Sequence, residues 1–413
     1  MMLNYSSTCN TCNGIVNLEI SNQLDDAFER MAKAIYEGLD ADQLYTDFYL
    51  ELSNGFADQI KQSYKIDFDK AVYNSPDLAT RQALVNNCFA FSGAKSYSQI
   101  QELQNMIINS KGDFKTFSDF KKAAQTINQE YNKNWLRTEY NNAVNSSISA
   151  AQYQRYIKDA DLYPYLIYQT AGDSNVRPEH QRLDGIKLPI NDPFWNTYYP
   201  PNAWGCRCDV NQDSSPRNIT ETETAKERAG EAVKSKLFKN NPGKSGIIFK
   251  NSHPYFKNVV GKIDELKAVD NYGLKSVNQI YADPNKLSKR LDEFATEDDF
   301  NEWWLKNSST NKKFIINDQK QTIKLLANDE LNKKVISSGA WKYAKELPVV
   351  IQAPDEVYKT DSATVYIKYY NNKPIVAVAN QTKAVFNIEL FYEAEPTAKV
   401  LDKIRKGILL FKK

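Results

Sequence analysis

Apolar side chains recur every three or four residues through the first part of the chain, which is the spacing of amphipathic helices. The clearest stripe follows Ser21 and comprises Leu24, Phe28, Met31, Ala32 and Ile35. Similar spacing predicts helices over about 41–64, 76–90 and 96–109, with a loop, FSGAKS, around Gly93 and Lys95. Residues 20–160 are therefore expected to form a helical bundle.

The longest helical pattern extends over 117–158 and follows a capping signal, Thr116 with Asp119 three residues later. One face of this pattern is mainly aromatic and aliphatic and comprises Phe120, Ala124, Ile127, Tyr131, Trp135, Tyr140 and Val144. Large apolar side chains of this kind usually belong to a core. We therefore expect the stripe to pack inside the bundle rather than to form a docking surface.

Residues 168–210 have no sustained apolar period and are rich in turn signals such as Leu-Asp-Gly, Asn-Asp-Pro and Tyr-Pro-Pro. A long loop-rich segment inside a compact domain is usually functional. Something must hold it in place. The candidates are Trp195 and Trp204 as apolar anchors, or His180, Cys206 and Cys208 as metal ligands. No nucleophile, base and orienting group occur together here, so this segment is not predicted to be catalytic.

After Val210 the sequence becomes polar, which predicts a linker over 211–260 with an exposed helix at about 220–236. Gly243-Lys244-Ser245 ends like a phosphate-binding loop, but Phe238 stands where the first glycine of that motif is required. Asn-Pro-Gly is therefore interpreted as a turn. His253, within the sequence HPYF, is interpreted as part of a structural tether rather than as a base.

The pattern of a second domain begins at about residue 261. Helices are predicted over 283–294, 296–306 and 329–346, with Thr296 and Asp299 capping the second of them. A short apolar run, Val349 to Ile351, comes before three segments with period-two alternation, which predict strands at 364–370, 375–379 and 384–392. Helices followed by a meander of strands are typical of an α+β domain with an antiparallel sheet.

Composition narrows the functional classes. The chain has 413 residues, enough for two or three domains, and its net charge of +2 gives no whole-chain basis for binding nucleic acid. The start of the chain lacks the basic and apolar regions of a secretory signal, and its 5 cysteines are scattered, so we expect free thiols in a reducing cytoplasm. No apolar run approaches the ~18 residues that a membrane span needs.

The loop-rich segment resembles the signature of the Mu F-like phage minor head proteins, the head-morphogenesis family. The family pattern is G-D-x-x-V-R-P-x-H-x-x-L-D-G, then D-P-F-W, then P-P-N-x-W-x-C-R-C. The matching residues here are Gly172, Asp173, Val176, Arg177, Pro178, His180, Leu183, Asp184 and Gly185, then Asp192 to Trp195, then Pro200 to Cys208. The resemblance extends from about Phe91 through NNPGKSG and HPYF. It implies a phage or prophage minor head protein that joins the capsid at or near the portal.

The sequence departs from this family in its potential metal ligands. Many members carry C-P-x-C where this chain has Arg177 to His180, and a histidine where it has Ala203. Because two potential ligands are gone, we expect no cofactor, and a zinc ion bound by His180, Cys206 and Cys208 is the alternative. Without metal, Arg177 could fasten the loop by pairing with Asp173 or Asp184. A further alternative is a four-thiolate site in which Cys9 and Cys12 join Cys206 and Cys208.

The C-terminal part is similar to the phage-encoded nuclease-like domains of the barnase–EndoU–colicin E5/D–RelE-like group. The likeness rests on the run APDEVY, on Tyr-Ile-Lys in the following strand, on a hairpin, and on a closing KIRKG. It implies a metal-independent ribonuclease whose candidate catalytic residues are Lys368, Tyr366, Glu389 and Arg405. Relatives often have a histidine in this domain, and this chain has none after His253. The alternative interpretation is that Lys368 and Glu389 are exposed strand residues that form a cross-strand pair.

Together these observations predict an α+β protein with three parts. Residues 1–210 are a mainly helical head-morphogenesis domain that ends in the loop-rich signature, 211–260 a linker or tether, and 261–413 a small nuclease-like α+β domain. The resemblance implies portal and major capsid proteins as partners, RNA as a further partner of the C-terminal domain, no membrane, and a place in the virion. A ribonuclease toxin delivered with the particle and a purely structural virion protein with an inactive nuclease-like domain both remain open.

Overall fold

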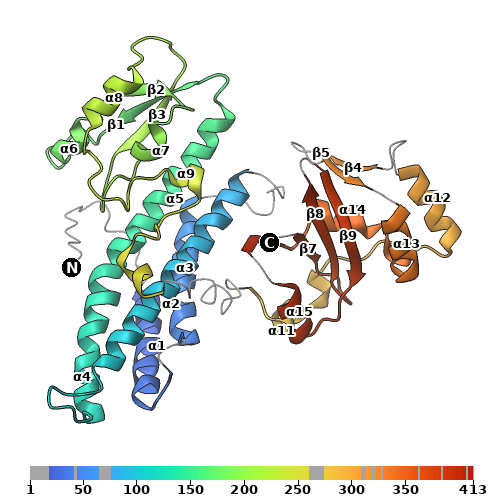
Figure 1. The fold of residues 1–413 in the computed structure, drawn as a ribbon, viewed down its shortest axis with the longest axis horizontal. Coiled ribbons are helices and arrows are strands. Elements are labelled where there is room, and N and C mark those ends of the chain that lie inside the picture. Colours follow the sequence, from blue (N-terminus) through green and yellow to red (C-terminus); the bar gives the residue numbers. More distant parts are fainter. Residues whose placement is uncertain are drawn as a thin grey trace. The chain divides into compact units, whose positions relative to one another are not determined.

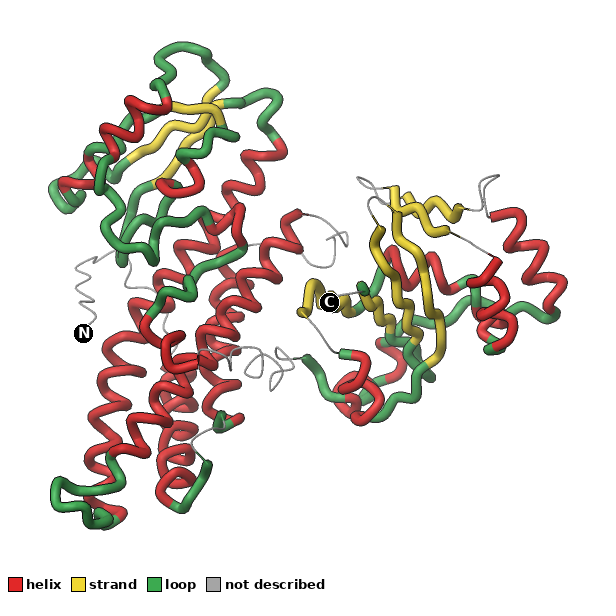
Figure 2. The backbone as a smooth tube through the Cα atoms, viewed as in Figure 1, coloured by secondary structure: helices red, strands yellow, loops and turns green. Residues whose placement is uncertain are grey.

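The computed structural model describes residues 18–40, 44–64, 76–259, 274–307, 313–317, 322–326, 329–360, 363–382, 385–405 and 408–412. The chain divides into two compact units. The first comprises Met1–Ile66 and Ala83–Gly273, and the second comprises Asp67–Gln82 and Leu274–Lys413. Helices dominate the first unit, and a large sheet dominates the second (Figures 1 and 2).

Long helices make up the bundle of the first unit. They are α1 (Leu18–Tyr36), α2 (Thr46–Tyr64), α3 (Pro76–Asn105), α4 (Phe117–Asn128) and α5 (Leu136–Lys158), and α3 contributes only from Ala83 onwards. The apolar stripe after Ser21 is buried on α1, as its spacing predicts. Aromatic side chains fill the space between the helices. The centroid of the Phe56 ring lies 4.4 Å from that of Tyr140 and 5.7 Å from that of Phe91. Edge-to-face contacts of this kind add to the burial of apolar area.

The predicted break at Gly93 and Lys95 is wrong, because α3 passes through it without interruption. Lys95 is completely buried there, and its Nζ donates a hydrogen bond to the Tyr131 carbonyl at 2.7 Å and pairs with the Glu139 carboxylate. A buried lysine needs such a partner. The partner is distant in sequence, so the short polar run FSGAKS has the appearance of a loop.

The long helical pattern over 117–158 is confirmed. It comprises α4, a π-helical segment, η3 (Gln129–Trp135), and α5, which follow one another directly. Its start is also as predicted, since the Thr116 hydroxyl accepts a hydrogen bond from the Asp119 amide at 3.2 Å. Phe120, Ala124, Ile127, Tyr131 and Tyr140 are buried, which agrees with a core role for the stripe.

The loop-rich segment is organised on a small antiparallel sheet. Its strand order is β2 (Lys187–Pro189), β1 (Tyr165–Gln169), β3 (Asp209–Asp213), with Tyr168 paired to Val210. Short helices α6 (Pro178–Gln181) and α7 (Trp195–Tyr198) interrupt the turns, and α8 (Thr222–Ala229) follows the sheet. The core of this part contains Leu166, Tyr168, Leu183, Leu188, Phe194, Trp195, Tyr199, Val210 and Ala225.

The stretch from residue 211 to 259, expected to be a linker, belongs to the first unit instead. The Asn87 side chain on α3 accepts hydrogen bonds from the amides of Ile248 and Phe249, at 2.8 and 2.7 Å. The Phe249 ring stacks on Phe91 with 3.7 Å between ring centroids. Helix α9 (Pro242–Ser245) and the 3-10 helix η4 (Pro254–Val259) complete this stretch. Most of its polar side chains are exposed, but buried apolar side chains and hydrogen bonds to its backbone hold the stretch on the bundle.

The second unit is built on a seven-stranded sheet in the order β10, β6, β7, β8, β9, β5, β4. The strands are β4 (Lys313–Asn317), β5 (Thr322–Leu326), β6 (Glu356–Lys359), β7 (Thr364–Lys368), β8 (Ile375–Thr382), β9 (Val385–Glu393) and β10 (Ile408–Lys412). All neighbouring pairs are antiparallel except β5 and β9, which run parallel. The α+β class is therefore confirmed for the chain.

Helices cover one face of this sheet. They include α13 (Asp329–Ser337), the 3-10 helix η6 (Ala340–Tyr343) and α14 (Glu346–Gln352), which contact β7, β8 and β9. The shared core contains Phe300 and Trp304 of α12 (Glu297–Asn307), Leu347 and Val350 of α14, and Tyr366, Ala377 and Phe391 of the sheet. The described part of the unit also contains α11 (Val277–Ile280) and α15 (Ala398–Ile404).

Several predictions for this unit are confirmed and others are wrong. Strands β7, β8 and β9 lie where the period-two pattern placed them, and Thr296 and Asp299 cap α12 through hydrogen bonds of 2.8–3.2 Å. The helix predicted over 283–294 is reduced to a 3-10 turn at Pro284–Lys286. The short apolar run Val349–Ile351 lies in helix α14, where Val350 and Ile351 join the core of the unit. Strands β4, β5, β6 and β10 were not predicted.

Among the helices of the described residues, none is both long and apolar enough to cross a membrane.

Candidate functional site

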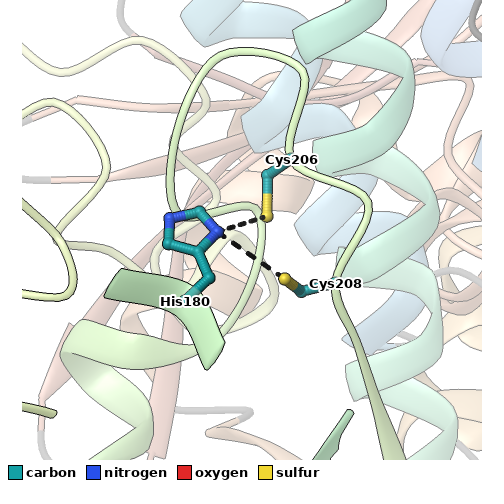
Figure 3. Close-up of side chains that lie close together, drawn as sticks. All are labelled: His180, Cys206 and Cys208. Carbon is teal, nitrogen blue, oxygen red and sulfur yellow. Dashed lines mark hydrogen bonds between the residues drawn. The ribbon is translucent and has the colours of Figure 1, made fainter. Parts of the chain in front are cut away.

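Two cysteines and a histidine converge in the loop-rich part of the first unit (Figure 3). His180 lies on α6, and Cys206 and Cys208 flank Arg207 just before β3. The Nδ1 atom of His180 lies 3.7 Å from the Cys206 sulfur and 3.6 Å from the Cys208 sulfur. His180 and Cys206 are buried, and Cys208 is partly exposed. The three residues proposed as metal ligands from the sequence are thus brought together.

The surrounding turns hold both arms of this cluster. The Arg177 guanidinium donates to the Trp204 carbonyl at 2.7 Å, so it joins the turn before His180 to the turn before Cys206. The Tyr168 hydroxyl donates to the Asn202 side chain at 2.8 Å, and both residues are buried. Arg177 therefore does not fasten the loop by pairing with an aspartate.

The aspartates of the signature have other partners. Asp184 accepts hydrogen bonds from the amide and hydroxyl of Thr170, at 2.7 and 2.8 Å. Asp173 forms a bidentate pair with Arg207, with both contacts at 2.6 Å. Hydrogen bonds from Arg207 hold the pKa of Asp173 below its usual value. The charge pairing of this loop thus uses Arg207, which lies between the two cysteines.

The two thiols differ in acidity. The hydrogen bond from Cys208, together with the nearby His180, holds the pKa of Cys206 well below its ordinary value, although burial acts in the opposite direction. The pKa of Cys208 is raised by that same hydrogen bond and by burial. Cys206 is therefore the first to become a thiolate, which is the form that binds metal ions. Cys9 and Cys12 lie outside the described residues.

Aromatic packing anchors the same segment. Trp195 is fully buried, and its Nε1 donates to the Pro189 carbonyl at 2.9 Å. This agrees with its predicted role as an apolar anchor. Trp204 is only partly buried and packs edge-on against Phe238, with 5.0 Å between ring centroids.

In the second unit, Tyr366 and Lys368 lie on the helix-covered face of β7. Tyr366 belongs to the apolar core, and Lys368 is buried with its Nζ donating to the Ala353 carbonyl at 2.7 Å. The interpretation of Lys368 as an exposed residue paired with Glu389 is wrong, because β8 lies between their strands. Glu389 is exposed and accepts a hydrogen bond from the Asn380 side chain.

Arg405 lies at the C-terminal end of α15 and forms a polar cluster on the other face of the sheet. Its guanidinium contacts both Glu356 carboxylate oxygens, at 2.9 and 2.7 Å, and the Tyr369 hydroxyl at 3.0 Å. The Tyr358 hydroxyl donates to Glu356 at 2.9 Å. Glu356 pairs with Ile367 across the sheet, so it faces away from Tyr366 and Lys368. The four predicted catalytic residues therefore do not meet in one site.

Electrostatic interactions keep Arg405 charged and the hydroxyls of Tyr358 and Tyr369 protonated. Burial lowers the pKa of Arg405, but the Glu356 carboxylate outweighs it and the net pKa is raised. Burial and the same carboxylate raise the pKa values of Tyr358 and Tyr369, so both hydroxyls stay protonated at neutral pH. Sequence reasoning missed Glu356, Tyr358 and Tyr369. The signal was present in APDEVY, where a glutamate and a tyrosine two residues apart share one face of a strand.

Comparison with known proteins finds one similar family for a segment of each unit. Residues 101–211 match the family model of Phage Mu protein F like protein. Residues 302–412 match the model of the phage-Barnase-EndoU-ColicinE5/D-RelE like nuclease2 domain. The chain thus joins a Mu F-like segment to a nuclease-like domain, as the sequence resemblances implied.

Two curated proteins are similar to part of the chain. One is the putative capsid assembly protein F of Escherichia phage Mu, 43% identical over 82 residues, which are 20% of this chain and 19% of that protein. The other is the Mu-like prophage FluMu F protein of Haemophilus influenzae, 40% identical over 75 residues, which are 18% of each chain. The similarity thus spans about a fifth of each relative. No solved structure matches the chain significantly.

Proposed function

We propose that this protein takes part in assembling a phage or prophage head and carries a C-terminal ribonuclease domain. One observation supports this most directly: a segment similar to a capsid assembly protein and a nuclease-like domain occur on the same chain. In this proposal the protein associates with the virion, its first unit contacts portal and major capsid proteins, and its second unit acts on RNA as a toxin that travels with the particle.

The proposed chemistry uses the polar cluster around Glu356. A scissile phosphate that attracts Arg405 would release the Glu356 carboxylate, which then takes the proton of the ribose 2′-hydroxyl. The 2′-oxygen bonds to phosphorus and the bond to the 5′-oxygen breaks, giving a cyclic phosphate. Tyr369, which stays protonated at neutral pH, supplies the proton for the leaving 5′-oxygen. The Glu356 carboxylate and the Tyr369 hydroxyl each contact the Arg405 guanidinium, at distances of 2.7–3.0 Å.

The test is RNA cleavage by the full-length protein, with total tRNA and mRNA as substrates. We expect Glu356→Gln to reduce cleavage about 100-fold, the contribution typical of a general base. Tyr369→Phe removes one hydroxyl and leaves the Glu356–Arg405 pair in place, so it should lower the rate at a cost of only about 1 kcal/mol in stability. The matched controls are Lys368→Met and Glu389→Gln, which alter the residues first predicted from the sequence.

Two results would contradict parts of this proposal. A loss of cleavage in the Lys368 or Glu389 variants, with Tyr369→Phe unaffected, would place the chemistry elsewhere in the domain. If the wild type cleaves no RNA but still copurifies with portal or major capsid protein, the structural alternative holds. That alternative is supported by the burial of the Glu356–Arg405 pair, whose side chains are each only 7% exposed.

A further inference from the structure

The His180, Cys206 and Cys208 cluster has the separations of a metal site. A zinc ion lies 2.0–2.1 Å from nitrogen and 2.3 Å from sulfur ligands, so tetrahedral angles place the two ligand atoms about 3.6 Å apart. The two observed separations between nitrogen and sulfur are 3.7 and 3.6 Å. All three potential ligand atoms lie within 4.8 Å of one another. These separations suit one ion bound by all three atoms.

Hydrogen bonds account for the contact between the two cysteines and for one contact of His180, but they leave the second contact of His180 unexplained. Each imidazole nitrogen has either one proton to donate or one lone pair to accept with. The Nδ1 atom of His180 can therefore satisfy one sulfur and not both, although both lie at nearly the same distance. A metal ion bonded to all three atoms satisfies each of them at once.

The charge that the three ligands would carry also indicates a metal ion. His180 and Cys206 are nearly inaccessible to solvent, and burying an unpaired charge is costly. Two thiolates and a neutral imidazole carry a charge of about −2, which a divalent cation neutralises. Thiolate and imidazole ligands select zinc over calcium or magnesium, which prefer oxygen.

We propose that His180, Cys206 and Cys208 bind one zinc ion, with water in the fourth position on the partly exposed side of Cys208. The ion joins α6 to the start of β3, two segments whose ligands lie 26 residues apart in the chain. Its role is structural, although water holds one position, because the ion cross-links two segments of the loop-rich part and its ligand Cys208 packs against the core that contains Trp195. This proposal is independent of the nuclease activity and of the head assembly role.

The experiment uses the full-length protein produced with zinc in the growth medium. Elemental analysis should find one zinc per chain in the wild type and less than a tenth of that in Cys206→Ser/Cys208→Ser. Cobalt substitution should give the visible bands of a tetrahedral site together with thiolate charge-transfer absorption. The matched control is Cys88→Ala, which removes a buried cysteine outside the cluster and should leave metal content unchanged.

Further variants keep the test decisive if the double variant does not fold. Cys208→His exchanges one ligand type for another, so it should retain zinc while the thiolate absorption of the cobalt form falls by about half. Cys9→Ser/Cys12→Ser should keep both the zinc and the full absorption, and loss of metal in that variant would overturn the proposed ligand set. A wild type that stays metal-free after incubation with zinc, or that contains a Cys206–Cys208 disulfide and no metal, would overturn the site itself.

Discussion

At the scale of single residues, the first unit places ionisable side chains where water is excluded. Lys95 and Glu139 are both completely buried, and the Tyr255 hydroxyl donates to Glu139 at 3.1 Å. His253 lies beside them among aromatic rings, 4.6 Å from Tyr255 and 5.1 Å from Phe91 between ring centroids. Tyr255 is a neighbour in sequence, but Phe91 and Lys95 come from the distant helix α3, so no local pattern indicates how completely His253 is buried.

The burial of His253 predicts a dependence of stability on pH. Burial and the Lys95 charge lower the pKa of His253 to about 3, whereas an unfolded histidine has a pKa of about 6.5. Between these values the unfolded chain binds one proton more than the folded chain. The free energy of unfolding contributed by His253 is therefore fully present above pH 6.5 and is lost as the pH falls towards 3.

The measurement compares the wild type with His253→Phe, which keeps an aromatic ring and removes the titration. Urea unfolding at pH 7 and pH 5 should show that the wild type loses about 2 kcal/mol more than the variant over this interval. Since both proteins retain every other titrating group, the difference isolates His253. Equal losses in the two proteins would mean that folding leaves the pKa of His253 unchanged, which would contradict its burial as a neutral side chain.

At the scale of elements, prediction was reliable where periodicity was long and local. The helices over 117–158 and the strands at 364–368 and 375–382 were predicted correctly, because each has a regular apolar period over many residues. The prediction of secondary structure failed where a partner distant in sequence determines the structure. Lys95, which lies within α3 and bonds to Tyr131, is the example. For the nuclease-like domain, alternation correctly placed Tyr366 and Lys368 on one face. Which face the helices cover depends on tertiary packing, so the sequence could not show that this face is buried.

Helix α9 provides an element-level test of the packing of residues 211–259. A Cβ atom on Gly243 would lie 2.6 Å from the Tyr153 Cβ on α5, and the Gly243 carbonyl accepts a hydrogen bond from Gln154 at 2.7 Å. Gly243→Ala must therefore displace α9 from α5, at a cost of about 1–3 kcal/mol in the free energy of unfolding. Limited proteolysis of this variant should cut within 211–259, where the wild type resists.

The control for that experiment is Lys236→Ala, an exposed position in the same stretch, which should change stability by less than about 0.5 kcal/mol. If Gly243→Ala were as stable and as resistant as this control, α9 would not be held against α5. Residues 211–259 would then behave as the linker that their composition suggests.

At the scale of the whole molecule, the chain forms two separate hydrophobic cores that are built from different secondary structure. The first unit combines a helical bundle with the loop-rich sheet around Trp195, and the second encloses Phe300 and Trp304 between helices and the seven-stranded sheet. Each core is large enough to sustain cooperative unfolding of its own unit. This division follows the two segments that match different families, at 101–211 and 302–412.

Calorimetry should therefore show two transitions that single substitutions shift separately. Trp195 and Phe300 are both fully buried, one in each core, and truncating a buried aromatic side chain costs roughly 3–5 kcal/mol. Trp195→Ala should lower the melting temperature of one transition and Phe300→Ala that of the other. Removing zinc with a chelator should move the transition that Trp195→Ala moves, because the proposed ion lies in the same unit. If either substitution shifted both transitions by the same amount, the two units would unfold as a single cooperative body.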